Sequence, residues 1–292
     1  MDEALFENFA KELTALVACD EAGRGASRLS SHSELMRAVS AFAPLGKVAV
    51  ISGFYIPAAG APETDGPGGA AILARAFQRD GRKCEIWTDE RCLEVIAACA
   101  AAAGCAAGTA KIAPASLASG APDGLIFVER PGRAADGRFY NFRKQDITEW
   151  CAPLDTLAEE AEKYGIRTIG IGDGGNEVGM GSYHDELSAL LPDYVSCLSV
   201  VRTEFALTAD VSNWGAYALA DALSFVWGVP RGIEPGEETK MLEAALRAGA
   251  VDGISGKHEA SVDGFTSKLL EKKIYRLKSI RERYNARRAA KK

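Results

Sequence analysis

The chain has 292 residues, of which 47% are hydrophobic and 25% charged, as is typical of a globular protein with a substantial core. Its net charge of −6 argues against binding along a nucleic-acid backbone, and the alanine-rich run 97–107, interrupted by Gly104, is too weakly apolar to span a membrane. The acidic start Met1-Asp2-Glu3 lacks the positive region of a signal peptide, and the seven cysteines form no C-x-x-C pair. We therefore expect a cytoplasmic protein with reduced thiols.

The charge is unevenly distributed along the chain. Residues 264–292 hold eleven Lys or Arg and two Glu, so the region before them is strongly acidic. Apolar residues recur in this basic segment at helical spacing, namely Leu270, Ile274, Leu277 and Tyr284. We expect an α/β domain of the catalytic type over residues 1–263, and over 264–292 a basic helix that packs on it or extends from it. An acidic domain is compatible with a bound divalent metal.

Strand-like and helix-like segments alternate along the chain. Helices are expected at 2–18, 68–80, 90–103, 153–165, 213–227 and 237–248, and strands at 47–52, 84–87, 124–128, 166–171 and 197–201. Strands that alternate with helices of this length predict a mainly parallel sheet with helices on both faces. The expected fold class is therefore α/β and Rossmann-like.

The segment 172–181 holds five glycines and follows the expected strand 166–171. Polar, glycine-rich bends after a strand are where open α/β sheets place their ligands. Gly170, Gly172 and Gly175 satisfy G-x-G-x-x-G, so a dinucleotide loop is one interpretation. Two carboxylates within this loop, Asp173 and Glu177, argue against it, because they would lie beside the phosphates.

Carboxylates with an amide at a glycine bend suit a hard cation instead. Asp173 and Glu177 lie four residues apart and would converge if a helix began at Asn176, although such residues also commonly cap turns. Glu63 and Asp65 lie in the loop that follows the expected strand 47–52, which in a parallel sheet emerges at the same edge. Four carboxylates would then meet in one cleft.

A third loop after a strand is cationic. Arg130 and Arg133 have guanidinium groups whose geometry matches a substrate carboxylate, but they could equally be solvated on the surface. Ser212 precedes an expected helix and reads as its N-cap. The sequence contains no H-x-x-x-H pair, no G-x-S-x-G and no G-x-x-x-x-G-K-[ST], which argues against a histidine zinc site, a hydrolase triad and a P-loop.

Four segments together resemble the D-glutamate cyclase family, in its C-terminal domain. They are Ser52-Gly53-Phe54 with Pro62-Glu63-Thr64-Asp65-Gly66-Pro67; Glu129-Arg130-Pro131-Gly132-Arg133; Gly172-Asp173-Gly174-Gly175-Asn176-Glu177; and Ser212-Asn213-Trp214-Gly215. The resemblance covers roughly residues 5–285. In longer, mitochondrial relatives this domain follows a separate hydro-lyase-like domain that has no counterpart in this sequence. The resemblance also implies divalent metal binding, with manganese-dependent phosphatase activity as a second assignment.

The cyclase hypothesis assigns a role to each group. D-glutamate closes to 5-oxo-D-proline when its amine attacks its own γ-carboxyl carbon, which needs a base and a Lewis acid or strong donors. The expected residues are Asp65, Asp173 and Glu177 for a Mn²⁺ or Mg²⁺ ion, Glu63 as ligand or base, Arg130 and Arg133 for the α-carboxylate, the N–H groups of Gly174 and Gly175 as oxyanion donors, and Asn176 and Asn213 in the substrate site.

Two other functions remain open at this point. In a phosphatase, the same acids would hold two metals that activate water, and the arginines would bind phosphate. A non-catalytic module that binds an amino acid or a metal is the third possibility. In each case the expected partner is a small molecule, and self-association into a homo-oligomer is left open.

Overall fold

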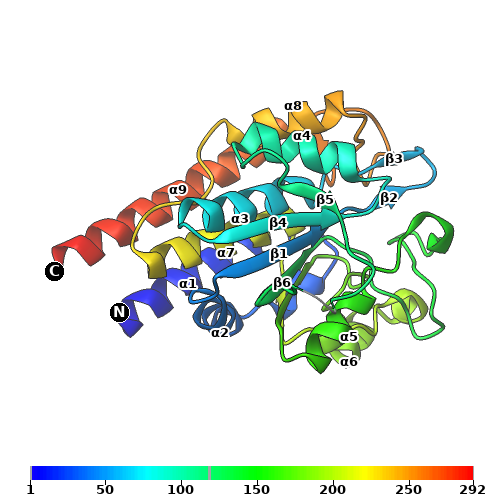
Figure 1. Ribbon diagram of the computed structural model, residues 1–292, viewed down its shortest axis with the longest axis horizontal. Helices are drawn as coiled ribbons and strands as arrows, with labels where there is room; N and C mark the ends of the chain where they lie inside the picture. The colour runs from blue at the N-terminus through cyan, green and yellow to red at the C-terminus, as the bar shows by residue number, and fades with distance from the viewer. Residues whose placement is uncertain (1, 118–119, 292) are drawn as a thin grey trace.

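Six short strands form one parallel sheet in the computed structural model, which describes residues 2–117 and 120–291 (Figure 1). The strands are β1 (Lys47–Ser52), β4 (Lys83–Thr88), β5 (Ala110–Ile112), β6 (Gly124–Val128), β7 (Arg167–Gly172) and β8 (Phe205–Thr208). They are ordered β5-β4-β1-β6-β7-β8 across the sheet. The chain thus winds outward from β1 in one direction and then, from β6, in the other, which is the doubly wound arrangement of the Rossmann fold.

The central strands are buried on both faces, which explains their continuous apolar sequences. In β1, Val48 and Val50 pack into a large cluster on one face, whereas Ala49 and Ile51 pack into a smaller cluster with β6 and α5 on the other. This alternation follows from the two-residue period of a strand. The expectation of an α/β fold with helices on both faces is confirmed.

The two faces are covered unequally. The helices are α1 (Glu3–Val17), α2 (His32–Phe42), α3 (Pro67–Arg79), α4 (Leu93–Ala103), α5 (Thr156–Lys163), α6 (His184–Leu190), α7 (Ser212–Trp227), α8 (Glu237–Arg247) and α9 (Ser267–Ala290). The large cluster includes residues of seven of them, α5 and α6 being the exceptions. Figure 1 shows α5 and α6 on the opposite side of the sheet.

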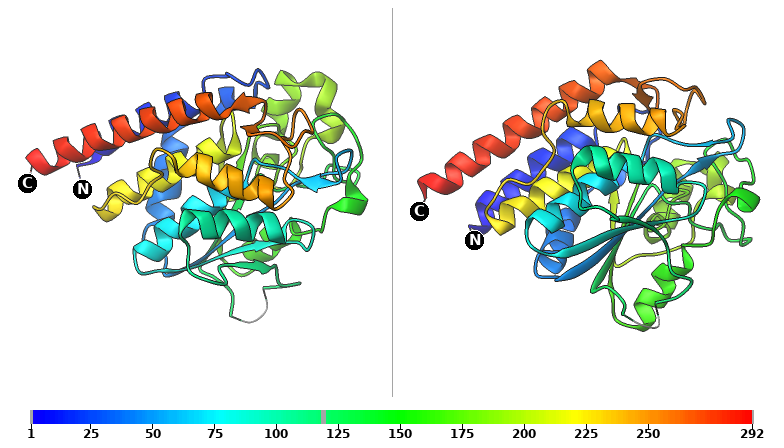
Figure 2. Two further views of the ribbon diagram at one scale, coloured as in Figure 1. Left: turned by 90° about the horizontal axis from the view of Figure 1, so that it is seen from above. Right: turned by 45° about the horizontal axis from the view of Figure 1, so that its top comes forward.

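The basic C-terminal helix packs on the body and then extends past it. In α9, Leu270, Ile274, Leu277 and Tyr284 are buried in the large cluster, as their spacing predicts. Figure 2 shows α9 running beside α1, with the two chain ends close together. Several basic residues of α9 are exposed, but Lys273 and Arg281 are buried against the body, where Arg281 pairs with Asp221 at 2.7 Å.

One expected strand is wrong. Residues 197–201 do not join the sheet, and the sixth strand is β8, which begins at Phe205. The backbone N–H groups of Ser199 and Val200 instead donate to the carbonyl oxygens of Gly175 and Arg133, at 2.9 and 3.0 Å. This apolar segment is buried against the glycine-rich loop, which accounts for its strand-like sequence.

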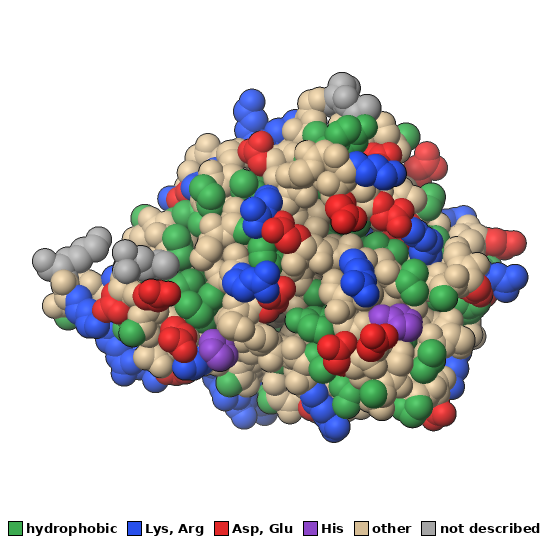
Figure 3. All heavy atoms as spheres, turned by 90° about the horizontal axis from the view of Figure 1, so that it is seen from below, with side chains coloured by type: hydrophobic (Ala, Val, Ile, Leu, Met, Phe, Trp, Pro, Cys, Tyr) green, Lys and Arg blue, Asp and Glu red, His purple; other side chains and the backbone are tan. Residues whose placement is uncertain are grey.

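The described residues include no helix that is both long and apolar enough to cross a bilayer. On the face shown in Figure 3, acidic and basic side chains are interspersed rather than gathered in a patch of one sign. The acidic residues that the sequence predicts to meet in one cleft lie at the carboxyl ends of the strands. In a doubly wound sheet, ligands bind at this edge, near the point where β1 and β6 lead to opposite directions of winding.

Candidate active site

Buried carboxylates from three strand-end loops meet at the carboxyl edge of the sheet. Asp65 follows β1, Glu129 follows β6 and Asp173 follows β7. One carboxylate oxygen from each lies within 4.8 Å of the other two, and the three residues are at most 6% exposed. The sequence predicts the meeting of Asp65 and Asp173, and the structure adds Glu129 as the third member.

Backbone N–H groups at the start of α7 hold Asp65 in place. Its Oδ2 accepts the N–H of Ser212 and its Oδ1 that of Asn213, each at 2.9 Å. The N-terminal end of a helix favours negative charge, so α7 both positions and stabilises this carboxylate. Ser212 is thus the first residue of the helix, after Val211, and is not its side-chain cap.

Glu129 has an unusual backbone conformation. Its φ is +46°, a region that non-glycine residues adopt infrequently, and it comes directly after β6. The hydroxyl of Ser212 donates to its Oε2 at 2.5 Å, which ties the turn to α7. Strained residues of this kind are concentrated at ligand sites, where the surrounding structure holds them in position.

A single guanidinium lies among the acids. Nη2 of Arg24, from the loop after α1, is 2.7 Å from Oδ2 of Asp173 and 2.7 Å from Oδ2 of Asp263. The Arg24 side chain is only 11% exposed. Its charge offsets part of the repulsion between the carboxylates, so Arg24 belongs to the site.

Glu63 and Glu177 complete the group of acids in different ways. Glu177 folds back so that its carboxylate accepts the N–H groups of Gly174 and Gly175 at 2.9 and 2.7 Å. No helix begins at Asn176, and these two N–H groups are already engaged, so they point neither at a pyrophosphate nor at an oxyanion. The Oε1 atom of Glu63 is buried and has no hydrogen-bond partner among the described residues.

The protonation of these acids reflects their burial. Desolvation raises the pKa of Asp65 to about 7, and it raises the pKa values of Glu63, Glu129 and Asp173 well above the usual carboxyl range. Neighbouring carboxylates add to the effect, whereas Arg24 opposes it at Asp173. Burial also raises the pKa of Glu177, and the two N–H donors offset only part of that increase. Six carboxyl groups around one guanidinium form a site that suits an additional cation.

A cavity of about 140 Å³ opens onto this group. Its acidic lining residues are Glu63, Glu129, Asp173, Glu177 and Asp263, and its cationic lining residues are Arg24 and Arg143. Asp65, which is 1% exposed, lies behind them. A small molecule in this cavity would therefore have carboxylates on its inner side and the exposed Arg143 at the mouth.

The structure places the two expected substrate arginines elsewhere. The guanidinium of Arg130 is buried and donates to Asp89 at 2.6 Å and to the carbonyl oxygen of Gly53 at 2.9 Å. Arg133 pairs with Asp155 at 2.8 Å and with Glu159. Neither lines the cavity. Both guanidinium groups already pair with acidic side chains of the protein, so a substrate carboxylate in the cavity needs another partner.

The two asparagines also separate. Asn176 lines the cavity, and its Nδ2 donates to the carbonyl oxygen of Tyr140 at 2.9 Å. Asn213 does not line it; its Oδ1 accepts the N–H groups of Gly66 and Gly69 at 3.1 and 2.6 Å. Asn213 therefore fixes the start of α3 against α7, and through it the position of Asp65.

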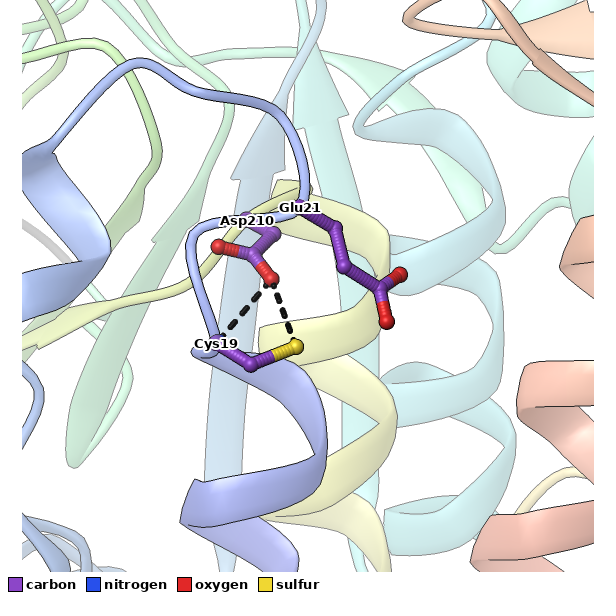
Figure 4. Close-up of side chains that lie close together, drawn as sticks. All are labelled: Cys19, Glu21 and Asp210. Atoms are coloured by element: carbon purple, nitrogen blue, oxygen red, sulfur yellow. Dashed lines mark hydrogen bonds between the residues drawn. The ribbon is translucent and has the colours of Figure 1, made fainter.

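A second close group, Cys19, Glu21 and Asp210, lies where α1 ends and α7 begins (Figure 4), and it does not line the cavity. Asp210 accepts the backbone N–H of Cys19 at 3.0 Å and that of Asp20 at 2.8 Å, and Glu21 pairs with Lys273 at 3.0 Å. These contacts satisfy the buried carboxylate of Asp210 within the protein, whereas Glu21 is exposed. The group anchors the loop that carries Arg24, whose Nη2 also donates to the carbonyl oxygen of Asp210 at 2.7 Å.

Comparison with known proteins agrees with the resemblance seen in the sequence. A family model described as D-glutamate cyclase-like, C-terminal, matches residues 13–278. The chain belongs to this family. It is also similar to the human protein named D-glutamate cyclase, mitochondrial, with 34% identity over 241 residues. That match covers 74% of this chain but 39% of the human protein, so the chain spans well under half the length of this relative.

Three residues of this site, Glu129, Arg24 and Asp263, were not among the site residues expected from the sequence. Glu129 could have been predicted in the same way as Asp173, because both are acidic residues that directly follow a strand. Arg24 lies in a glycine-flanked turn, Gly23-Arg24-Gly25, that gives no indication of its partners. Asp263 sits in a turn at φ +52° between β9 (Ser261–Val262) and β10 (Phe265–Thr266), and only the folded chain brings it to Arg24.

Proposed function

We propose that this protein converts D-glutamate to 5-oxo-D-proline and water, with a divalent cation bound by Asp65, Glu129 and Asp173. The single observation that carries the proposal is the meeting of these three buried carboxylates, with raised pKa values, beside a cavity. Membership of the D-glutamate cyclase-like family supports the choice of reaction. Because the match spans 39% of the human relative, the activity named for that whole protein comes to this chain as a proposal.

The donor set fits Mn²⁺ or Mg²⁺. Both ions prefer oxygen ligands, and the cluster offers carboxylate oxygens only. The excess of carboxyl groups over guanidinium groups supplies the negative charge that such an ion neutralises. When bound there, the ion would act as a Lewis acid on the γ-carboxyl group.

The protein's own residues supply the proton transfers. The reaction forms a bond between nitrogen and the γ-carbon, and it breaks one carbon–oxygen bond of the γ-carboxyl group. Two protons leave the ammonium group and depart with that oxygen as water. Glu63 is the base, because it lines the cavity and its Oε1 has no hydrogen-bond partner among the described residues. Once ionised, Glu63 would accept a proton from the amine, and its raised pKa suits it to hold that proton and return it to the leaving oxygen.

The rest of the cavity would orient the substrate. Phe54 and Ile56 provide apolar wall for the methylene groups, while Asn176 offers an amide oxygen to the ammonium group. The excess of acids favours a ligand that carries a cationic group, as an amino acid does. A simple dicarboxylate without an amine is therefore expected to bind less tightly.

A manganese-dependent phosphatase is the alternative that the same acids favour. Six carboxyl groups could hold more than one ion, and paired ions are a common arrangement for phosphoester hydrolysis. A non-catalytic binding module would use the cavity without turnover. The three functions differ in product, so one set of incubations separates them.

The metal-loaded protein should be incubated separately with D-glutamate, L-glutamate and a panel of phosphomonoesters. We expect 5-oxo-D-proline from D-glutamate, a loss of at least about 100-fold in Asp173→Asn, and little change in Glu204→Gln, whose exposed carboxylate pairs with Arg167 at 2.6 Å. Phosphate release that is abolished by Asp173→Asn, without any 5-oxo-D-proline, would replace the cyclase with the phosphatase. Binding of D-glutamate without product would favour the binding module.

A further inference from the structure

The substrate of the proposed reaction carries two carboxylates, and the cavity is lined mainly by acids. A second cationic group is needed to hold the end of the substrate that does not react. Arg24 is paired with Asp173 and Asp263, while Arg130 and Arg133 lie outside the cavity. We propose that Arg143 binds the α-carboxylate of the substrate, an inference that rests on the proposed cyclase function.

Arg143 is available for this role. It is exposed, lines the cavity, and its Nη2 donates to the backbone carbonyl oxygen of Ile254. Within residues 2–117 and 120–291, no carboxylate forms an ion pair with it. A guanidinium has five N–H donors in a planar fork, so the bond to Ile254 leaves donors for a carboxylate.

The loop that carries Arg143 is held by its own hydrogen bonds. Oδ1 of Asn141 accepts the backbone N–H groups of Arg143 and Gln145 at 2.9 and 3.0 Å. The base of the loop closes where the N–H of Ile147 donates to the carbonyl oxygen of Phe139 at 2.8 Å. Arg143 is therefore presented from a defined turn rather than from a loose segment.

Contacts on both sides fix this loop over the acids. The carbonyl oxygen of Tyr140 accepts from Asn176 of the glycine-rich loop, and the ring of Phe142 stacks on that of Tyr194 with centroids 4.4 Å apart. Ile254, which receives the guanidinium, is itself held because its N–H donates to Asp252 at 3.0 Å. Arg143 thus joins two loops across the mouth of the cavity.

This placement gives the substrate a direction. The carboxylate cluster is buried and Arg143 is exposed, so the two ends of the cavity offer opposite charges at different depths. The γ-carboxyl group would face the buried cluster, and the α-carboxylate would remain at the mouth against Arg143. A guanidinium binds a carboxylate through two parallel hydrogen bonds, which also fixes the orientation of the α-carbon.

The test compares Arg143→Gln and Arg143→Lys with a matched control, Arg138→Gln. Arg138 lies in the same loop, does not line the cavity, and forms an exposed pair with Asp146 at 3.5 Å. We expect Arg143→Gln to raise KM for D-glutamate at least about tenfold with a smaller change in kcat, and Arg143→Lys to recover part of the loss. Mn²⁺ affinity, measured by calorimetry, should not change in any variant.

Direct binding separates this inference from the proposed function. D-glutamate and inorganic phosphate are titrated into each metal-loaded variant. If the protein binds D-glutamate without forming product, and Arg143→Gln weakens that binding, the α-carboxylate role stands and the cyclase function fails. Binding of phosphate alone, weakened by Arg143→Gln, would overturn the assignment to a carboxylate. Unchanged affinity and KM in Arg143→Gln, or no binding of either anion, would overturn the role of Arg143.

Discussion

The guanidinium of Arg24 lies 2.7 Å from a carboxylate oxygen of Asp173, although 149 positions separate the two residues in the chain. The same nitrogen is equally close to Asp263, on a turn just before α9. Arg24 therefore joins the first loop, the centre of the sheet and the C-terminal region at one point. It also supplies the positive charge closest to the metal-binding carboxylates that we propose.

The first prediction concerns this counter-charge. Arg24→Gln leaves Asp173 and Asp263 without their cation, and breaking a buried ion pair costs roughly 3–5 kcal/mol. Urea unfolding in EDTA should show a free energy of unfolding that is lower by an amount near the bottom of this range, since the Arg24 side chain is partly exposed. Added Mn²⁺ should stabilise the variant more than the original protein, because it replaces the lost charge.

Arg28→Gln provides the control for this prediction. Arg28 lies close by in sequence, but its side chain is 64% exposed and pairs with Asp20 on the surface. Its replacement should leave the stability and the effect of Mn²⁺ nearly unchanged. Equal stabilisation of the original protein and Arg24→Gln by Mn²⁺ would show that Arg24 and the metal do not share these carboxylates.

The second prediction tests Glu129 as a metal ligand. Glu129→Gln keeps an oxygen that accepts the hydroxyl of Ser212, but it removes one of the three carboxyl groups that we propose as metal ligands. We expect Mn²⁺ affinity to fall at least about tenfold by calorimetry, with a small change in the unfolding midpoint of the metal-free protein. Unaltered Mn²⁺ affinity would remove Glu129 from the proposed site and leave Asp65 and Asp173 as its only supported ligands.

The third prediction concerns close packing beneath the glycine-rich loop. A Cβ atom added at Gly170 would lie 2.3 Å from the carbonyl oxygen of Val178 and 2.6 Å from the Cα of Gly179. Both are backbone atoms, so the loop must move. We expect Gly170→Ala to destabilise the protein by about 1–3 kcal/mol and to weaken Mn²⁺ binding, because Asp173 lies on the same loop.

Gly46→Ala is the matched control for Gly170. The added Cβ would lie 3.6 Å from an oxygen of Asp123, which is an ordinary contact, and Gly46 precedes β1 at the opposite edge. Thermal unfolding and calorimetry on both variants separate a general loss of stability from an effect on the site. A Gly170→Ala protein that binds Mn²⁺ normally would show that the loop does not position the metal ligands.

The sequence predicted the carboxyl edge of the sheet well, for a physical reason. Loops that follow parallel strands emerge at one edge of the sheet, so acids in these loops converge whatever their separation in the chain. This rule located Asp65 and Asp173, and it applied to Glu129 as well. Most elements were predictable because apolar strands and periodic helices alternate clearly. The expected elements did not include α2, β5 or α6, and the strand expected at 197–201 is wrong.

The cationic part of the site could not be predicted in this way. Arg130 and Arg133 follow β6, so the strand-end rule favoured them, yet their guanidinium groups turn toward Asp89 and Asp155. A long flexible side chain reaches many partners, and its direction depends on contacts that only the folded chain defines. Arg24 lies between α1 and α2, away from any strand end, and Arg143 lies far along the same connection after β6 that carries Arg130 and Arg133. Neither position in the sequence indicates where the guanidinium group will point.

The last prediction concerns a buried carboxyl outside the active site. Glu238, near the start of α8, is 3% exposed, and its Oε2 has no hydrogen-bond partner among the described residues. Burial raises the pKa of Glu238 from 4.5 to about 7. Between these two pH values the folded protein keeps the carboxyl proton that the unfolded chain has lost. Since the folded state then binds more protons, stability falls as pH rises between these two values.

The size of this effect can be measured with one variant. From the shift in pKa, Glu238 alone should make the protein about 2 kcal/mol less stable at about pH 8 than at about pH 5.5. Glu238→Gln cannot titrate, so its urea unfolding should show a pH dependence weaker by this amount and greater stability than the original protein at the higher pH. Parallel pH profiles for the two proteins would show that Glu238 keeps an ordinary pKa despite its burial.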